Sequence, residues 1–178
     1  MIFAYADPPY LSRDTAVAKC SDHYAEHPDS AKWNAPEAHH DLIGELLETY
    51  PNGWALSASS STLKSLLSVC PAEVRVLAWV KPWCAWRGQI NPAYAWEPVI
   101  MMGGRKRARE KPKVLDFLVA NAPLKTGTAG AKPEAFAFWM FRALGMRPGD
   151  EFIDIFPGSG AMQKAYERYC KQLSLFSS

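Results

Sequence analysis

The segment Ile-Phe-Ala-Tyr-Ala-Asp-Pro-Pro-Tyr, residues 2–10, is the most informative stretch of the sequence for the fold. It begins as a short apolar run and ends in two prolines, which cannot donate to the hydrogen bonds of a sheet. The pattern predicts a strand over residues 2–6 that stops abruptly. A carboxylate (Asp7) and an aromatic ring (Tyr10) then follow directly beyond the end of that strand.

Strands and helices alternate along the rest of the chain. We expect a polar loop over residues 11–35 and a helix that Asn34 caps and Pro36 begins. This order is typical of an α/β domain with a mostly parallel sheet covered by helices on both faces. In such sheets ligands bind beyond the carboxyl ends of strands, where residues 7–10 and 154–160 are expected to lie. The other expected strands are residues 54–58, 74–80, 96–102 and 152–156. The other expected helices are residues 61–69, 132–144 and 161–173, and Gly145 is expected to end the second of these.

The composition is that of an ordinary globular protein. The chain has 178 residues, of which 48% are apolar and 21% are charged, with a net charge of +2. These values suit one domain and exclude disorder, collagen and coiled coil, while the charge alone does not indicate nucleic-acid binding. The first residues lack the pattern of a signal peptide and no apolar run reaches 18 residues, so we expect a cytoplasmic protein without a membrane span.

The cysteines and histidines give a weak metal signal. Cys20, His23 and His27, with His39 and His40 further on, are residue types that bind zinc. The segment around the first three is polar and also contains acidic residues, so we interpret it as a loop and expect no metal. With no secretion signal, the four cysteines are expected to be reduced thiols.

Residues 7–10 combine groups that suit a flat base with an exocyclic amine. The ionised Asp7 offers only acceptor oxygens, and the prolines leave a rigid carbonyl group without a competing N–H. The ring of Tyr10 offers a stacking surface. The alternative interpretation is a strand that ends in a stiff, capped turn.

The second segment, Asp-Ile-Phe-Pro-Gly-Ser-Gly at residues 154–160, connects an expected strand to an expected helix. Its small residues let a ligand approach the backbone, and the start of the helix favours an anion. A plain connection between a strand and a helix is the alternative interpretation, because a glycine-rich loop alone is weak evidence.

Asp-Pro-Pro-Tyr after a strand resembles the catalytic motif of the S-adenosylmethionine-dependent amino-methyltransferases, most often those that act on the N6 amine of adenine in DNA. Residues 154–160 resemble the cofactor loop of the same superfamily, and Lys132-Pro133 resembles its Lys-Pro motif. Residues 96–100, Trp-Glu-Pro-Val-Ile, resemble a strand of the phage and bacterial Asp-Pro-Pro-Tyr/Trp methylases. The four motifs stand in the order of the circularly permuted class. Related RNA-adenosine enzymes carry Trp where Tyr10 stands.

The resemblance implies a Rossmann-like methyltransferase fold that occupies residues 1–178 as a single domain, with no separate target-recognition domain. The permuted enzymes usually continue beyond the glycine-rich loop to an acidic residue that holds the cofactor ribose, whereas only residues 161–178 follow it here, as in a truncated C-terminus. A ribose acceptor is then expected from Gln163, Glu167 or a partner chain.

The resemblance also implies the roles of the site residues. Asp7 and the Pro8 carbonyl would accept the two amine protons while Tyr10 stacks on the base, so that the amine attacks the methyl group of S-adenosyl-L-methionine directly. The implied catalytic residues are Asp7, Pro8, Pro9 and Tyr10, and the implied cofactor-binding residues are Asp7, Lys132, Asp154, Phe156, Pro157, Gly158, Ser159 and Gly160.

Two basic stretches suit contacts with nucleic acid, through phosphate neutralisation and base stacking. A solvated loop and core aromatic residues are the alternative interpretations. The expected contact residues are Lys81, Trp83 and Arg87 in one stretch, and Arg105, Lys106, Arg107 and Arg109 in the other.

Other functions stay open at this point. The motif also suits methylation of RNA adenine or of cytosine N4 in DNA, and the chain is alternatively a non-catalytic methyltransferase-like subunit that binds nucleic acid. A homo-oligomer or a partner subunit is compatible with each. The sequence lacks a Gly-x-Gly-x-x-Gly fingerprint, which disfavours a dinucleotide-dependent oxidoreductase.

Overall fold

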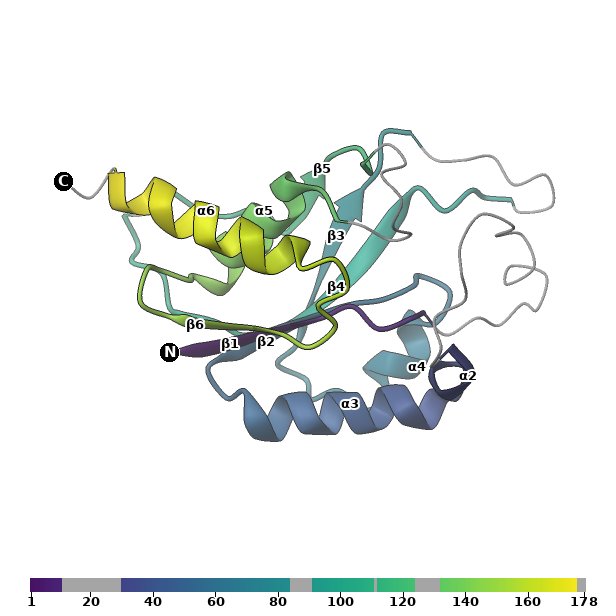
Figure 1. The fold of residues 1–178 in the computed structure, drawn as a ribbon. Coiled ribbons are helices and arrows are strands. Elements are labelled where there is room, and N and C mark those ends of the chain that lie inside the picture. Colours follow the sequence, from purple (N-terminus) through teal and green to yellow (C-terminus); the bar gives the residue numbers. More distant parts are fainter. Residues whose placement is uncertain (11–29, 84–90, 111, 124–131, 176–178) are drawn as a thin grey trace.

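The chain folds around a six-stranded sheet (Figure 1). The computed structural model describes residues 1–10, 30–83, 91–110, 112–123 and 132–175. The order of the strands across the sheet is β5-β3-β4-β2-β1-β6. The strands are β1 (Ile2–Ala6), β2 (Gly53–Ser57), β3 (Arg75–Val80), β4 (Trp96–Gly103), β5 (Phe117–Val119) and β6 (Glu151–Asp154).

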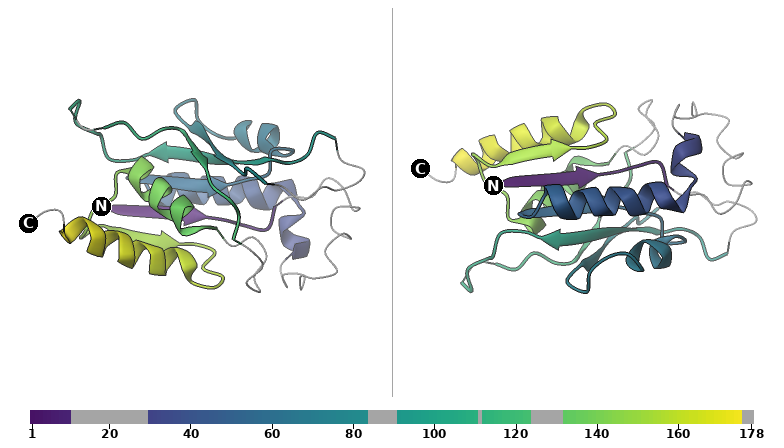
Figure 2. Two further views of the ribbon diagram at one scale, coloured as in Figure 1. Left: turned by 90° about the horizontal axis from the view of Figure 1, so that it is seen from above. Right: turned by 90° about the horizontal axis from the view of Figure 1, so that it is seen from below.

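Helices cover both faces of the sheet, as the sequence predicts. Helices α5 and α6 lie on one face and α3 and α4 on the other, which gives three layers (Figures 1 and 2). Within the described residues, none of the helices combines the length and the apolar character needed to cross a membrane. The helices are α2 (Ser30–Trp33), α3 (Pro36–Thr49), α4 (Leu63–Leu67), α5 (Glu134–Leu144) and α6 (Ala161–Leu175).

The direction of β4 makes the sheet a mixed one. Strand β1 is parallel to β2 and β6, and β3 is parallel to β5, whereas β4 is antiparallel to both β2 and β3. Three of the five pairings are therefore parallel. Because β4 runs in the reverse direction, its first residues lie at the end of the sheet where β1, β2 and β3 finish.

Alternation along the strands divides the core into two clusters. In β1, Phe3 and Tyr5 belong to the cluster that includes α5 and α6, whereas Ala4 and Ala6 belong to the cluster that includes α3. This is the two-residue period of a strand, here with both faces buried. The apolar run that ends at Asp7 is thus a central strand of the sheet.

Several boundaries differ from those predicted from the sequence. Helix α2 lies inside the stretch expected to be a polar loop and takes up the residues just before α3. Ala35, and not Asn34, is therefore the N-cap of α3, in an extended conformation, while Pro36 begins the helix as predicted. Lys132 precedes α5, because Pro133 is the N-cap of that helix. The short strand β5 was not predicted, since only three residues pair there.

Phe141 of α5 is fully buried where α5, α6 and β6 meet. The centroid of its ring lies 5.0 Å from that of Phe152, 5.2 Å from that of Tyr166 and 5.4 Å from that of Tyr169. Edge-on and tilted arrangements of this kind are favourable for aromatic pairs. This cluster fixes α5 and α6 to the strand from which the glycine-rich loop begins.

Replacement of Phe141 by alanine should lower the free energy of unfolding by about 3–5 kcal/mol, because the change removes buried area and leaves a cavity. Phe117→Ala is the matched control, since Phe117 of β5 is 47% exposed. The control should lose less than about 1 kcal/mol. Urea unfolding followed by circular dichroism measures both variants, and equal losses would contradict the described packing.

Candidate functional site

One end of the sheet gathers charged side chains on the face covered by α5. Tyr5 of β1 and Trp79 of β3 pack on this face. Asp7 lies two positions beyond Tyr5, and Lys81 lies two positions beyond Trp79, so the two-residue period of a strand carries both to the same side. Glu97, near the start of β4, is the register partner of Trp79. The topology therefore brings charged residues from three strands to one place.

Lys132, in the segment before α5, forms a buried ion pair with Asp7. Its Nζ atom lies 2.9 Å from Oδ1 and 2.8 Å from Oδ2 of Asp7. The Lys132 side chain is only 5% exposed, and that of Asp7 is 22% exposed. The ring centroids of Tyr10, Trp79 and Phe136 lie 5.5, 5.8 and 6.0 Å from the ammonium group, which is the range of cation–π attraction.

Tyr10 and Glu97 complete this arrangement. The Tyr10 hydroxyl donates to Glu97 Oε2 at 3.0 Å, lies 3.2 Å from Asp7 Oδ1 and accepts a hydrogen bond from Lys132 at 3.2 Å. Glu97 Oε2 also lies 3.5 Å from Lys132 Nζ, and Glu97 Oε1 forms an ion pair with Lys81. We call Asp7, Tyr10, Lys81, Glu97 and Lys132 the Asp7 cluster.

Burial and the charges of neighbouring groups shift the pKa values of Asp7, Glu97 and Lys132 in opposite directions. Burial raises the pKa of Asp7 above its usual value, and the attraction of Lys132 offsets only part of this effect. For Glu97, burial would raise the pKa, but Lys132 and Lys81 outweigh burial and lower it. Burial would lower the pKa of Lys132, but the two carboxylates hold it above its usual value. Burial, Asp7 and Glu97 raise the pKa of Tyr10 well above its usual value, so its hydroxyl keeps its proton at neutral pH.

The loop after β6 lies beside the end of β1, because the two strands are parallel neighbours. Asp154, the last residue of β6, is the register partner of Tyr5, and the Ile155 N–H donates to the Tyr5 carbonyl at 2.9 Å. Gly158 and Gly160 have φ angles of 48° and 71°, in the left-handed region that favours glycine. The glycines therefore allow the turn that leads into α6.

Asp154, the last residue of β6, carries a buried carboxylate oxygen atom. Within the described residues, no donor reaches its Oδ1 atom. Burial raises the pKa of this carboxyl to about 6, the negative charge of Asp7 adds to the rise, and a hydrogen bond from the Phe156 backbone opposes it. Buried acceptors in proteins almost always have a donor, so Asp154 is a candidate for binding a cationic group or another donor.

The residues predicted to be catalytic or cofactor-binding lie at this end of the sheet. They come from the segment that follows β1, from the segment before α5, and from the end of β6 with the loop that leads into α6. They are Asp7, Pro8, Pro9, Tyr10, Lys132, Asp154, Phe156, Pro157, Gly158, Ser159 and Gly160.

The residues predicted to contact nucleic acid are divided between the two ends of the sheet. Lys81 belongs to the Asp7 cluster, and Trp83, two residues further on, is 73% exposed. Arg87 lies outside the described residues. The other predicted contacts follow the carboxyl end of β4, which the antiparallel direction of this strand places at the opposite end of the sheet from the Asp7 cluster. These residues are Arg105, Lys106, Arg107 and Arg109.

Arg105 has a structural position at that opposite end. Its Nη2 atom lies 2.6 and 2.7 Å from the two carboxylate oxygens of Asp150, and its Nε–H donates to the Gly145 carbonyl at 3.1 Å. Burial would raise the pKa of Asp150, but the hydrogen bonds from Arg105 and from the Arg147 backbone lower it. Gly145 ends α5 as predicted, with a φ angle of 71°. Arg105 thus joins the end of β4 to the end of α5, away from the Asp7 cluster.

The structure describes only some of the cysteine and histidine residues that were considered as zinc ligands. Cys20, His23 and His27 lie outside the described residues. His39 of α3 is buried, and its Nε2 atom lies 2.8 Å from the Trp33 carbonyl oxygen. In the part of the chain that the structure describes, no group of three or more histidine, cysteine, aspartate or glutamate side chains could hold a metal ion.

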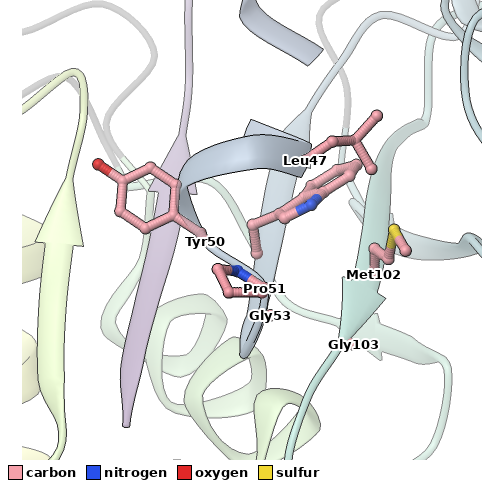
Figure 3. A pocket seen from close by; sticks show the side chains of 7 residues that line it. Leu47, Tyr50, Pro51, Gly53, Met102 and Gly103 are labelled. Atoms are coloured by element: carbon pink, nitrogen blue, oxygen red, sulfur yellow. The ribbon is translucent and has the colours of Figure 1, made fainter. Parts of the chain in front are cut away.

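A small pocket lies at the amino end of β2, away from the Asp7 cluster (Figure 3). Its cavity volume is about 40 Å³, whereas pockets for drug-sized ligands measure about 300–1,000 Å³. The pocket is therefore too small for a nucleotide. Its lining consists of Leu47, Tyr50, Pro51, Gly53, Trp54, Met102 and Gly103.

Glu97 is the member of the Asp7 cluster that the sequence analysis did not assign to the site. A glutamate inside an otherwise apolar strand, between Trp96 and Pro98, was the available signal. Its location depends on the direction of β4, because the start of a parallel strand would lie at the other end of the sheet. Tyr10 and Lys81 both depend on Glu97 for a hydrogen bond or ion pair.

Comparison with solved structures identifies the class of fold. The chain has an α/β Rossmann-like methyltransferase fold, similar to that of solved methyltransferase structures. One of these is a complex of M1.HpyAVI with SAM, with a TM-score of 0.60 and 16% sequence identity, over 94% of this chain and 78% of that chain. A second structure of M1.HpyAVI gives a TM-score of 0.58 and 12% identity, over 94% and 75% of the two chains. No protein-family model and no curated protein matches the sequence.

The Asp154 carboxyl should titrate near pH 6 in a carbon NMR titration. Replacement of Asp7 by asparagine should lower this pKa, because it removes a neighbouring negative charge, but the pKa should stay above that of an exposed aspartate since burial is the larger cause. Asp41→Asn, on the exposed face of α3, is the control and should leave the Asp154 titration unchanged. An Asp154 pKa that does not respond to Asp7→Asn would contradict the described proximity.

Proposed function

We propose that this protein transfers a methyl group from S-adenosyl-L-methionine to the N6 amine of adenine in DNA. The observation that carries the proposal is the Asp7 cluster, in which a carboxylate beyond β1 lies against Tyr10 and Lys132 beside a glycine-rich loop. The methyltransferase fold supports it, because a similar solved structure is a complex of M1.HpyAVI with SAM. In this proposal residues 1–178 act as one methyltransferase domain.

The residues around Asp154 suit the methyl donor. The buried Oδ1 atom of Asp154 needs a hydrogen-bond donor, and the methionine part of S-adenosylmethionine carries an ammonium group. Gly158 and Gly160 have no side chains to block the backbone, and the first N–H groups of α6 suit a carboxylate. Asp154, Lys132 and the loop from Phe156 to Gly160 would hold the donor, which supplies a methyl group on a positively charged sulfur.

Asp7, Pro8 and Tyr10 would present the amine for reaction. The target adenine must leave its stack, since its amine is otherwise inside the duplex. Asp7 and the Pro8 carbonyl oxygen would accept hydrogen bonds from the two amine N–H groups, which aligns the nitrogen lone pair for direct attack on the methyl carbon. The methyl–sulfur bond would break as the methyl–nitrogen bond forms, the thioether of the donor would leave, and the methylated amine would lose one proton to water. Tyr10 stacks on the base, and the negative charge of Asp7 stabilises the positive charge that develops on the nitrogen.

Contacts with the DNA would come from the segment that follows β3. Trp83 is 73% exposed and lies two residues after Lys81 of the Asp7 cluster, so its ring is available to stack on an unpaired base. The stretch that begins at Arg105 lies at the opposite end of the sheet, so a role in DNA binding there would require a second contact surface. We therefore assign the contact near the reacting base to Trp83.

A direct product analysis tests the proposed function. The protein is incubated with labelled S-adenosylmethionine and unmethylated duplex DNA, with RNA in parallel, and the nucleic acid is digested to nucleosides that are then separated. Label in N6-methyladenine from DNA is the expected result. Label in N4-methylcytosine, or in RNA alone, would overturn the assignment of adenine in DNA as the substrate. Absence of label and of cofactor binding would overturn the enzyme assignment in favour of a non-catalytic subunit.

Replacement of Asp7 by asparagine should reduce methyl transfer by about 100- to 1,000-fold, because an amide lacks the charge that stabilises the transition state. Asp41→Asn makes the same chemical change on the exposed face of α3 and should leave the rate unchanged. Calorimetric binding of S-adenosylmethionine and thermal unfolding establish that both variants are folded. A rate for folded Asp7→Asn close to that of the wild type would contradict the mechanism.

A further inference from the structure

We propose that Glu97 is a positioning residue of the methyl-transfer site. Its carboxylate holds the Tyr10 hydroxyl and gives Lys132 an acceptor other than Asp7. The inference rests on the proposed function, because it assigns to Glu97 a part in presenting the same amine. It adds a residue from β4 to a site otherwise formed by the segment after β1, the segment before α5 and the loop after β6.

Lys132 is surrounded by several hydrogen-bond acceptors. Its ammonium group has three N–H donors, and in this structure it lies 2.8 and 2.9 Å from the oxygens of Asp7 and 3.2 Å from the Tyr10 hydroxyl. Both Asp7 oxygens are therefore engaged by Lys132. An amine that enters to donate to Asp7 must share these oxygens with the lysine, since a carboxylate has about four acceptor sites on its two oxygens. Glu97 Oε2, at 3.5 Å from Nζ, is the acceptor to which Lys132 turns when Asp7 binds the amine.

Glu97 also fixes the orientation of Tyr10. Its hydroxyl donates to Glu97 Oε2 at 3.0 Å, which ties the ring that would stack on the base to β4. Glu97 is itself held by the ion pair with Lys81 of the segment after β3. Glu97 thus connects Lys81, just beyond β3, to Tyr10, whose ring is the proposed stacking surface. Loss of the central carboxylate would leave the ring without this anchor.

Glu97 also acts on the charge of Asp7. The ionisable groups that face it are Lys132, Glu97, Tyr10, Tyr5 and Asp154. Burial is the largest cause of the raised pKa of Asp7, and the negative charge of Glu97 raises it further. Replacement of Glu97 by glutamine removes that repulsion, so the pKa of Asp7 falls and the carboxylate form persists to lower pH.

The test compares Glu97→Gln with Glu73→Gln, an identical chemical change at an exposed position before β3. Steady-state methyl transfer is measured from pH 4 to pH 9. In Glu97→Gln, kcat should fall by on the order of 100-fold, as for a misplaced reacting group, while the KM for S-adenosylmethionine changes by less than about threefold. The acidic limb of the kcat profile should move to lower pH. Glu73→Gln should match the wild type in all three quantities.

Two outcomes would overturn the inference. One is a Glu97→Gln variant with the kcat and pH profile of the wild type. The other is a fall in kcat with an unshifted acidic limb and a lower melting temperature, which a merely structural role would give. If Glu97→Gln does not fold, Glu97→Asp is tested in its place. A kcat above half of the wild-type value, with an unchanged pH profile, supports the requirement for a carboxylate at this position. No activity in a folded Glu97→Asp variant contradicts that requirement. A wild-type protein that methylates nothing would instead overturn the proposed function itself.

Discussion

The buried ion pair between Asp7 and Lys132 is the interaction on which the arrangement of the site depends. The two residues are 125 positions apart in the chain, yet Lys132 Nζ contacts both carboxylate oxygens. A buried ammonium group is costly unless it is paired, and Lys132 is almost fully covered. Asp7 meets that need and so ties the end of β1 to the start of α5. Tyr10 and Glu97 then bind to the same pair and complete a compact group of compensating charges.

The two ends of the sheet differ in the use of their ion pairs. At one end, the Asp7 cluster leaves a carboxylate beside a glycine-rich loop and near Asp154, whose buried Oδ1 atom has no donor among the described residues. At the other end, Asp150 binds Arg105 and the amino group of Met1. These contacts hold the amino ends of β1 and β6 beside the end of β4. The antiparallel direction of β4 produces this division, because it takes Glu97 to the first end and Arg105 to the second.

Local patterns predicted much of the fold and the candidate site from the sequence. The strand that ends at Ala6, just before Asp7, and the helix end at Gly145 depend on neighbouring residues, and both agree with the prediction. The contribution of Glu97 was not predictable in the same way, because it depends on which strands β4 pairs with and in which direction. The same pairing decides that Arg105 lies at the opposite end of the sheet from Asp7, although the sequence predicted a contact with nucleic acid for its basic stretch. Helix α2 and strand β5 are too short to give a periodic signal.

A double-mutant cycle on Asp7 and Lys132 tests this account most directly. The free energy of unfolding is measured by urea denaturation for the wild type, Asp7→Asn, Lys132→Met and the double variant. Each single change leaves a buried group without its partner, so the two effects should not add, and a coupling free energy of about 1–3 kcal/mol is expected. Additivity within about 0.5 kcal/mol would contradict the claim that this ion pair assembles the site.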